Sequence, residues 1–332
     1  MVFVGGACGA EDQAAGPSAT TSTVASAQPA AVSLDEVVLD TFDGGSLPLS
    51  EATTADTERL LDVIAPIDEP VYQRAATADW LAADDLVLGF VGGDGTARAY
   101  PHRILDLHEL VTEVVDGQPV VITYCPLCRS GVVYDRRLDH PNHRGTLTFA
   151  NSSALYQNDL VMIDHQTGSY WWQVAGRAIV GSLTGAELVV LPSRTARWGD
   201  WLADHPDSLV LADEQGFDRD YGLDRFVGYE AAVDQGRTPF PVDDAHFADD
   251  RLAPSTRIIG FEGPGFAVAV PAEGSPAVVE IERGGARFEV RRASGSAAVW
   301  QLRPGGADPY PSRSSFWYAY LAAFPEVEVV SG

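Results

Sequence analysis

Short runs of aliphatic and β-branched residues, separated by Gly, Pro and Asp, dominate the chain from residue 85 onward. Runs of this length between turn residues are typical of β-strands. Apolar residues at helical spacing predict a few short helices beside them. The predicted strands are LVLGFV, PVVITY, GVVYD, TLTFA, ELVVL and SLVL, and the predicted helices cover about residues 51–61, 101–114 and 195–204. The pattern therefore predicts an α+β fold that is predominantly β, with short covering helices.

Two segments recur later in the chain in the same order. Residues 87–101, VLGFVGGDGTARAYP, match residues 258–271, IIGFEGPGFAVAVP, with one residue deleted at the turn. Residues 198–211, WGDWLADHPDSLVL, match residues 317–330, WYAYLAAFPEVEVV, with Trp, Leu, Ala, Pro and Val at equal offsets. Because two matches in one order are improbable by chance, they predict a duplicated β-rich unit.

The repeat also indicates where function lies. The second copy is short and degenerate: it has no Cys and no His, and it lacks most of the segment between Asp135 and Ser193. Residues confined to the long copy are therefore the better candidates for function. The predicted segments are a truncated lipoprotein-like signal and flexible tether (1–32), a mixed N-terminal segment (33–84), the long repeat (85–212), a connector (213–255) and the short repeat (256–332).

The N-terminus suggests where the protein resides. The first eight residues, MVFVGGAC, end in Cys8 and precede a tract of small and polar residues that cannot bury enough surface to become ordered. A small residue before Cys8 and a tether after it resemble the cleavage end of a bacterial lipoprotein signal, in which the cysteine receives the lipid. The alternative is a disordered N-terminus in which Cys8 is incidental. We expect an extracytoplasmic protein, lipid-tethered or secreted, and no transmembrane span, because no other apolar run approaches the ~20 residues required.

The charge excludes several classes of function. The chain has 22 basic residues, all of them Arg, against 47 acidic residues, and its formal net charge is −25. Without Lys, Schiff-base chemistry and a phosphate-loop lysine are excluded. Because so acidic a surface repels polyanions, we expect no nucleic-acid partner.

Two of the three cysteines form the motif Cys125-Pro126-Leu127-Cys128, directly after the predicted strand PVVITY. This spacing suits a redox disulfide, half of a metal site or haem attachment, and Arg129 in place of His excludes covalent haem. Redox pairs of the thioredoxin kind lie at a helix N-terminus, whereas the residues after Cys128 predict another strand. A turn between strands instead resembles half of a zinc or iron knuckle. The other half is absent, so further ligands must be scattered His, Met or carboxylate groups.

Two residues are candidates for completing a metal site. His108 lies on the apolar face of the predicted helix before PVVITY, although it could equally be a core histidine bound to a backbone carbonyl. Met162, in the segment LVMIDHQTGSYWWQ, is the only methionine besides the initiator, and its alternative role is to fill the core. Thiolates, imidazole and thioether together suit soft Cu(I). The expected cofactor is a transition metal, with copper, zinc and iron all open.

The motif and its surroundings resemble a known family. TYCPLCRSG, with AYPHRILDLHELV before it and LTFANSSALYQNDLVMIDHQTGSYWWQVAGRAIVGSL after it, is similar to the prokaryotic domain-of-unknown-function family 3179 (DUF3179), and the likeness covers about residues 85–332. The resemblance assigns no reaction. It implies that the family motifs carry His108, Tyr124, Cys125, Pro126, Cys128, Met162, Asp164, Ser169, Trp171 and Gln173. We expect Tyr124, Asp164, Ser169, Trp171 and Gln173 to line a pocket at the site.

Three functions remain open. The first is a metal site centred on Cys125 and Cys128, for redox chemistry or metal handling. The second is a thiol–disulfide protein in which the same two cysteines cycle between dithiol and disulfide and exchange electrons with a redox partner. The third is a ligand-binding or structural lipoprotein with a permanent disulfide and a small-molecule cleft near Trp171. The sequence names neither a substrate nor a partner, and whether the protein is an enzyme stays open.

Overall fold

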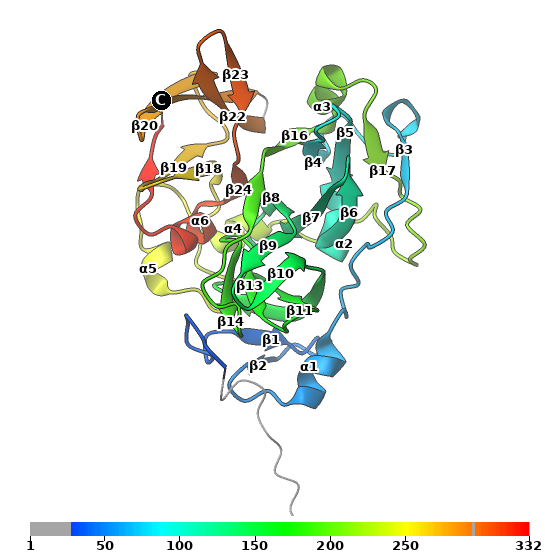
Figure 1. Cartoon of the computed structure of the whole chain (residues 1–332), viewed down its shortest axis with the longest axis vertical. Helices are drawn as coiled ribbons and strands as arrows, with labels where there is room; N and C mark the ends of the chain where they lie inside the picture. Colours follow the sequence, from blue (N-terminus) through cyan, green and yellow to red (C-terminus); the bar gives the residue numbers. More distant parts are fainter. Residues whose placement is uncertain (1–27, 294–295, 332) are drawn as a thin grey trace, which may run out of the picture.

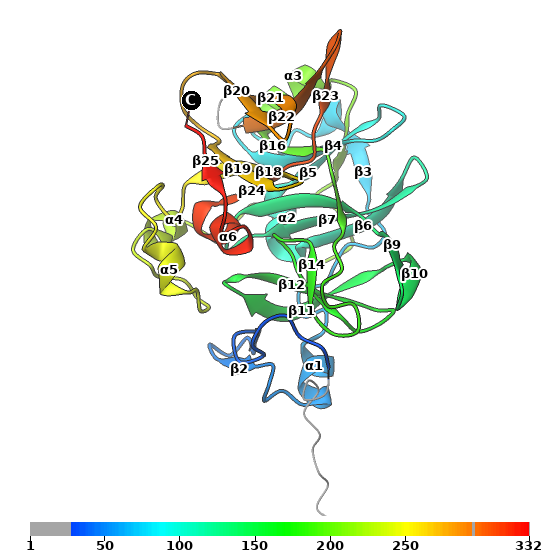
Figure 2. The same cartoon turned by 60° about the vertical axis from the view of Figure 1, so that its left-hand side comes forward.

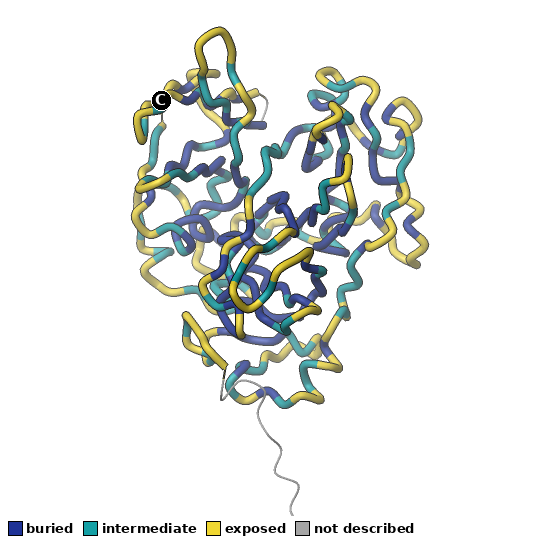
Figure 3. The backbone as a smooth tube through the Cα atoms, in the orientation of Figure 1, coloured by how far each residue is buried: buried dark blue, intermediate teal, exposed yellow. Residues whose placement is uncertain are grey.

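The structure is a computed structural model, and it describes residues 28–293 and 296–331. Strands make up most of its regular structure, and the helices are short (Figure 1). This confirms the predicted class, an α+β fold that is predominantly β. The buried residues concentrate where the sheets meet in the middle of the molecule, whereas the connecting loops are exposed (Figure 3).

An upstream strand set forms a five-stranded sheet, at the upper right of Figure 1. Its order is β16-β4-β5-β17-β3, and β17 runs parallel to β5. Helix α3 packs on this sheet so closely that a Cβ atom on Gly89 would lie 2.0 Å from the ring of Trp201. The absence of a side chain at this point of β4 therefore permits the contact. The elements are β3 (Tyr72–Arg74), β4 (Leu86–Val91), β5 (Ala97–Pro101), β16 (Ser193–Arg197), α3 (Trp198–Asp204) and β17 (Leu209–Leu211).

A downstream strand set repeats this arrangement on the left of Figure 1. Its order is β24-β18-β19-β25, and β25 runs parallel to β19. A Cβ atom on Gly260 would lie 2.1 Å from the ring of Tyr320, which belongs to helix α6. The elements are β18 (Arg257–Gly263), β19 (Phe266–Pro271), β24 (Arg313–Phe316), α6 (Trp317–Ala323) and β25 (Glu328–Val329).

The two strand sets also agree in register. Leu88 lies opposite Thr195 in the upstream set, and Ile259 lies opposite Ser314 in the downstream set. The hydroxyls of Thr195 and Ser314 are 2.8 Å apart and share a hydrogen bond. Corresponding positions of the two sets therefore meet where the sets adjoin.

Three strands of the long copy extend the sheet of the downstream set. The link is the pairing of β8 with β24, in which Gly131 lies opposite Ser314. Helix α2 precedes these strands. Strand β15 pairs with the end of β8 on the edge opposite β7. The elements are α2 (His102–His108), β6 (Leu110–Val115), β7 (Gln118–Cys125), β8 (Ser130–Asp135) and β15 (Val189–Leu191).

Strands from residues 149–180 form a separate six-stranded sheet with the N-terminal segment, in the lower half of Figures 1 and 2. Its order is β14-β13-β12-β11-β1-β2, so two strands from the start of the described chain complete it. The elements are β1 (Val38–Asp40), β2 (Ser46–Pro48), α1 (Thr54–Leu60), β11 (Phe149–Tyr156), β12 (Asp159–Asp164), β13 (Tyr170–Trp172) and β14 (Arg177–Val180).

The remaining elements are short helices, a hairpin and one further sheet. The connector carries α4 and α5, which lie beside α6 in Figure 2. A hairpin, β9–β10, and a four-stranded sheet, β20-β21-β22-β23, complete the fold. The elements are η1 (Ala75–Thr77), β9 (Arg137–His140), β10 (His143–Thr146), α4 (Tyr229–Val233), α5 (Asp244–Phe247), β20 (Val278–Arg283), β21 (Ala286–Ala293), β22 (Ser296–Arg303) and β23 (Gly306–Pro309).

Two predicted helices are shorter than expected. The helix predicted over 101–114 ends at His108, because Glu109 takes a left-handed φ of 58° and the chain continues as β6. The helix predicted over 195–204 begins at Trp198, because the residues before it pair with β4 as β16. Helix α1 lies within its predicted range. Across residues 28–293 and 296–331, no helix has both the length and the hydrophobicity needed to cross a bilayer.

Candidate metal centre

The CxxC motif forms the turn between β7 and β8. Cys125 pairs with Ser130 across the turn, and Arg129 takes a left-handed φ of 51°. As predicted, a strand and not a helix follows Cys128. The turn is anchored to the downstream set, because the Phe316 N–H donates to the Cys128 carbonyl at 2.7 Å.

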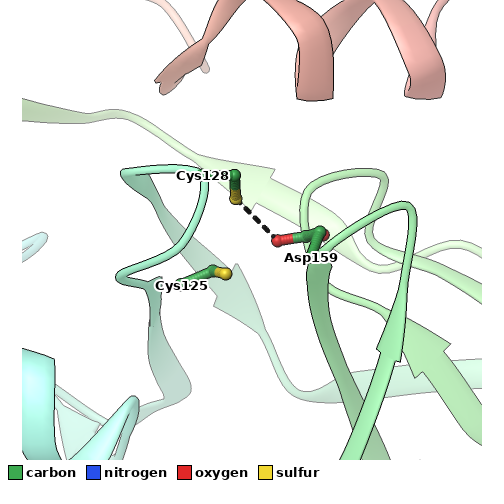
Figure 4. A group of neighbouring side chains, drawn as sticks. All are labelled: Cys125, Cys128 and Asp159. Atoms are coloured by element: carbon green, nitrogen blue, oxygen red, sulfur yellow. Dashed lines mark hydrogen bonds between the residues drawn. The ribbon is translucent and has the colours of Figure 1, made fainter. Parts of the chain in front are cut away.

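Asp159 is the third member of the site. It begins β12, directly after a two-residue hairpin turn in which Gln157 and Asn158 have φ of 53° and 57°. Positive φ at both positions is the geometry of a type I′ turn, and it fixes the start of β12. The Cys128 thiol donates to Asp159 Oδ1 at 2.9 Å, and the Val174 N–H donates to Oδ2 at 2.8 Å (Figure 4).

The three side chains offer a compact set of metal ligands. One ligand atom each from Cys125, Cys128 and Asp159 lies within 4.8 Å of the others. All three residues are at most 1% exposed. In Figure 4 the two sulfur atoms and the carboxylate point toward one another. Two thiolates and a carboxylate are a chemically reasonable set for a transition metal.

Burial governs the charge of this site. It raises the pKa of Cys125, it raises that of Cys128 well above the usual value, and it raises the pKa of Asp159 to about 6. Ionised groups without a counter-charge are costly in so dry a place, so the thiols stay protonated when no cation is present. A divalent cation would reverse this balance, because it compensates the negative charge of deprotonated ligands.

Met162 belongs to the same buried cluster as the two cysteines, together with Trp171. Its strand, β12, is the one that Asp159 begins. Asp164, at the other end of β12, accepts hydrogen bonds from the Thr167 N–H and from Trp171 Nε1. The carboxylate of Asp164 therefore stabilises the turn between β12 and β13, and it orients Trp171.

The other predicted pocket residues are distributed around the turn. Gln173 Nε2 donates to Thr123 Oγ1 at 2.7 Å, while its buried Oε1 has no partner. Ser169 Oγ accepts from the Leu183 N–H. Tyr124 lies on the opposite side of β7 from Cys125, and its ring packs on that of His102 at 4.3 Å between centroids. Gln173 thus contacts β7 beside the CxxC turn, Ser169 binds the segment after β14, and Tyr124 packs on the other side of β7.

The structure does not bring His108 to the thiols. Its Nδ1 lies 2.7 Å from the Ala65 carbonyl, and its Nε2 lies 2.8 Å from the Tyr221 hydroxyl. This is the arrangement of the alternative, a core histidine bound to a backbone carbonyl. Sequence reasoning missed Asp159, although the Gln157–Asn158 pair between two apolar runs is a recognisable hairpin turn.

A cavity of about 610 Å³ adjoins the turn. Pro126, Leu127 and Leu160 bound it on the side of the metal centre, and Glu109 and Asn151 bound it elsewhere. Glu109 Oε2 accepts a hydrogen bond from Asn151 Nδ2 at 2.5 Å. Burial raises the pKa of Glu109 to about 8. The cavity gives a small molecule room to approach the CxxC turn.

Glu109 and Ser153 in the wall of this cavity, and Asp62 behind Asn151, have strained backbones. Asp62, Glu109 and Ser153 all have left-handed φ, of 55°, 58° and 57°. Asn151 bonds to all three: its N–H donates to Asp62 Oδ1, its Nδ2 donates to Glu109, and its Oδ1 accepts from the Ser153 N–H. Strained residues held by redundant bonds cluster at functional sites.

Comparison with known proteins identifies one family. The family described as "Protein of unknown function (DUF3179)" matches residues 61–308, in agreement with the resemblance drawn from the sequence motifs. No curated protein matches the chain, and no solved structure does. Cys8 lies outside the described residues.

Proposed function

The chain belongs to the DUF3179 family, and we propose that it is an extracytoplasmic protein in which Cys125, Cys128 and Asp159 bind one transition-metal ion. The observation that carries the proposal is the convergence of three ligand atoms within 4.8 Å in a fully buried place. Burial and hydrogen bonds fix the three side chains before any ion arrives.

The ligand set limits the metal and its use. Thiolate ligands favour copper, zinc or iron over hard cations such as Mg²⁺. Met162 supplies a thioether in the same buried cluster and is a candidate fourth ligand. His108 is not included, because both of its ring nitrogens have other partners. Three protein ligands and an adjoining cavity suit a site for redox chemistry or metal handling, in which a coordination position stays open.

Elemental analysis with parallel thiol counting tests the proposal, on protein prepared without oxidant or chelator. We expect about one equivalent of copper, zinc or iron per chain. Cys125→Ser, Cys128→Ser and Asp159→Asn are each expected to lower the metal content at least tenfold, because each removes one of three ligands. Asp164→Asn and Cys8→Ser are the matched controls and should keep the metal.

The thiol count distinguishes a metal centre from a disulfide between Cys125 and Cys128. The structure has Cys125 and Cys128 as free, buried thiols of raised pKa, and such thiols are poor nucleophiles for exchange with a partner. In Cys8→Ser protein denatured without reductant, we expect two free thiols per chain. No metal together with no free thiol would contradict the metal proposal and favour a disulfide.

We also propose that a lipid on Cys8 holds the protein at a membrane, and the support is the sequence around Cys8 alone. Cell fractionation is the measurement. Wild-type protein is expected in the membrane fraction, and Cys8→Ser protein in the soluble fraction, because the substitution removes the proposed lipid anchor. Equal distribution of the two proteins would contradict the anchor.

We further propose that the two strand sets are copies of one ancestral unit, as the sequence repeat predicts. The shared strand order, the shared parallel pairing and the shared register support this. So does the equivalent contact of Gly89 with Trp201 and of Gly260 with Tyr320. Cys125, Cys128 and Asp159 all belong to the first of these two proposed copies.

A further inference from the structure

A second cavity, of about 260 Å³, lies where the two strand sets adjoin; we call it the junction cavity. Corresponding positions of the two sets line it together. Thr195 corresponds to Ser314 by strand register, and both are at its wall. The cavity is distinct from the metal centre, because Cys125, Cys128 and Asp159 are not among its lining residues.

His102 presents an unsatisfied polar atom here. The residue lines the junction cavity and is only 7% exposed, and its buried Nε2 has no hydrogen-bond partner among the residues that the structure describes. Its ring is held against Tyr124. Leaving a buried polar group without a partner costs about 1–3 kcal/mol, so such a group commonly marks the place of a ligand.

The charges around His102 select the sign of that ligand. Burial, and then the guanidinium groups of Arg129 and Arg257, hold the pKa of His102 well below its usual value. The imidazole is therefore neutral near neutral pH. Arg129 is already paired with Asp106 at 3.3 Å. Arg257 pairs only with Glu273, at 3.2 Å, and that carboxylate is 62% exposed.

The acidic residues of the lining do not cancel Arg257. Asp85 is paired with Arg103 as Asp106 is with Arg129. The other three, Asp84, Asp224 and Glu230, are exposed to solvent, where salt screens their charge. An exposed pair such as Arg257–Glu273 contributes little stability, so Arg257 can exchange its partner. Of the arginines that line the cavity, Arg257 is therefore the one whose carboxylate partner a ligand can most easily replace.

Comparison of the two strand sets indicates that the fold requires neither His102 nor Arg257. His102 follows Pro101 at the end of β5, and the corresponding residue after Pro271 is Ala272. Arg257 begins β18, and Leu86 begins β4 at the corresponding position. Each set thus accepts a small or apolar residue where the other has a hydrogen-bond donor. Both donors face one cavity.

We propose that the junction cavity binds a small monoanion that carries a carboxylate, with Arg257 and His102 Nε2–H as its donors. A planar carboxylate matches the guanidinium fork, and its second oxygen can accept from the imidazole. Because Arg257 is a single guanidinium group whose partner can be exchanged, it favours a monoanion over a dianion. The volume limits the ligand to a small metabolite.

Calorimetric titration of the full chain with acetate tests the proposal. Acetamide has the same shape without the charge and is the ligand control. The variants are His102→Ala and Arg257→Leu, which place at each position the residue that the other strand set already tolerates. His205→Ala and Arg303→Leu, outside the junction cavity, are the matched controls.

We expect acetate to bind and acetamide not to bind. Each junction variant should weaken acetate binding about tenfold or more, because each removes one hydrogen bond to a charged group. The control variants should bind as the wild type does, and thermal unfolding should show all four variants folded. The proposal is overturned if acetate does not bind at tens of millimolar, or if acetamide binds equally well. It is also overturned if phosphate or chloride binds more tightly than acetate, or if the junction variants match their controls.

Discussion

Replacing Glu109 with glutamine is expected to stabilise the protein in alkaline solution and to leave its stability unchanged in acid. The pKa of Glu109 is raised from 4.5 to about 8, because burial, aided by nearby carboxylates of which Asp159 acts most strongly, outweighs the opposing hydrogen bond from Asn151. The folded state therefore holds a proton that the unfolded state releases. Stability is full below about pH 4.5 and is lost as the pH rises toward about 8. Glutamine has no proton to lose, and it keeps an oxygen for Asn151.

The size of the effect follows from the shift in pKa. At about 1.4 kcal/mol per pKa unit, the loss in wild-type protein reaches up to about 5 kcal/mol above pH 8. Urea unfolding in the presence of a chelator measures it, at about pH 4.5 and about pH 9. Glu280→Gln, on the exposed face of β20, is the matched control and should change little at either pH. Equal effects of Glu109→Gln at both pH values would show that Glu109 is ionised in the folded protein.

A buried carboxyl group with so strongly shifted a pKa is a candidate for a functional role. Its side chain is protonated near neutral pH, it faces the cavity beside the CxxC turn, and its backbone is strained. A carboxyl group with a pKa near the working pH can both donate and accept a proton. Protein stability and the properties of this cavity wall are therefore in conflict, as they are at many catalytic sites.

Local sequence patterns predicted the surroundings of the two cysteines. The runs PVVITY and GVVYD became β7 and β8, and Cys125-Pro126-Leu127-Cys128 became the turn between them. These features depend on residues that adjoin in the chain, so hydrophobic runs and turn chemistry suffice to find them. The same reasoning correctly excluded a helix after Cys128.

The third ligand could not be chosen from the sequence. Asp159 is one of 47 acidic residues, and it meets the thiols only because the hairpin β11–β12 packs against the end of β7. His108 was the more obvious candidate. The helix that carries it ends at His108 itself, and the Tyr221 hydroxyl in the connector lies 2.8 Å from its Nε2. Both outcomes are set by contacts between distant segments, which periodicity does not encode.

The two strand sets could be recognised from the sequence, but their junction could not. Repeats in the sequence give corresponding positions, such as Thr195 and Ser314, without saying that these residues touch. The same holds for His102 and Arg257, which are 155 residues apart and lie on one cavity. Comparison of the two strand sets adds that Ala272 stands at the position corresponding to His102, and Leu86 at that corresponding to Arg257.

Gly89→Ala and Gly260→Ala are each expected to destabilise the protein by about 3 kcal/mol or more. The added methyl group would lie 2.0 Å from the ring of Trp201 in the first variant and 2.1 Å from that of Tyr320 in the second. Both rings are buried, and Trp201 Nε1 is held by Ser208 Oγ at 3.0 Å. Neither ring can move away without breaking packed contacts, so overpacking strains the core.

Thermal and urea unfolding measure these two effects. Gly306→Ala is the matched control, since no atom lies within 4 Å of its added methyl group, and it should change stability by no more than about 0.5 kcal/mol. In the double variant Gly89→Ala/Trp201→Leu, the alanine should cost much less than it does beside Trp201, because the smaller side chain leaves room for the methyl group. If Gly89→Ala and Gly260→Ala were no more harmful than Gly306→Ala, the close helix-on-strand contact would not be the feature that both strand sets depend on. Similar large losses in both, each relieved by trimming the facing ring, would show that one packing rule governs the two sets.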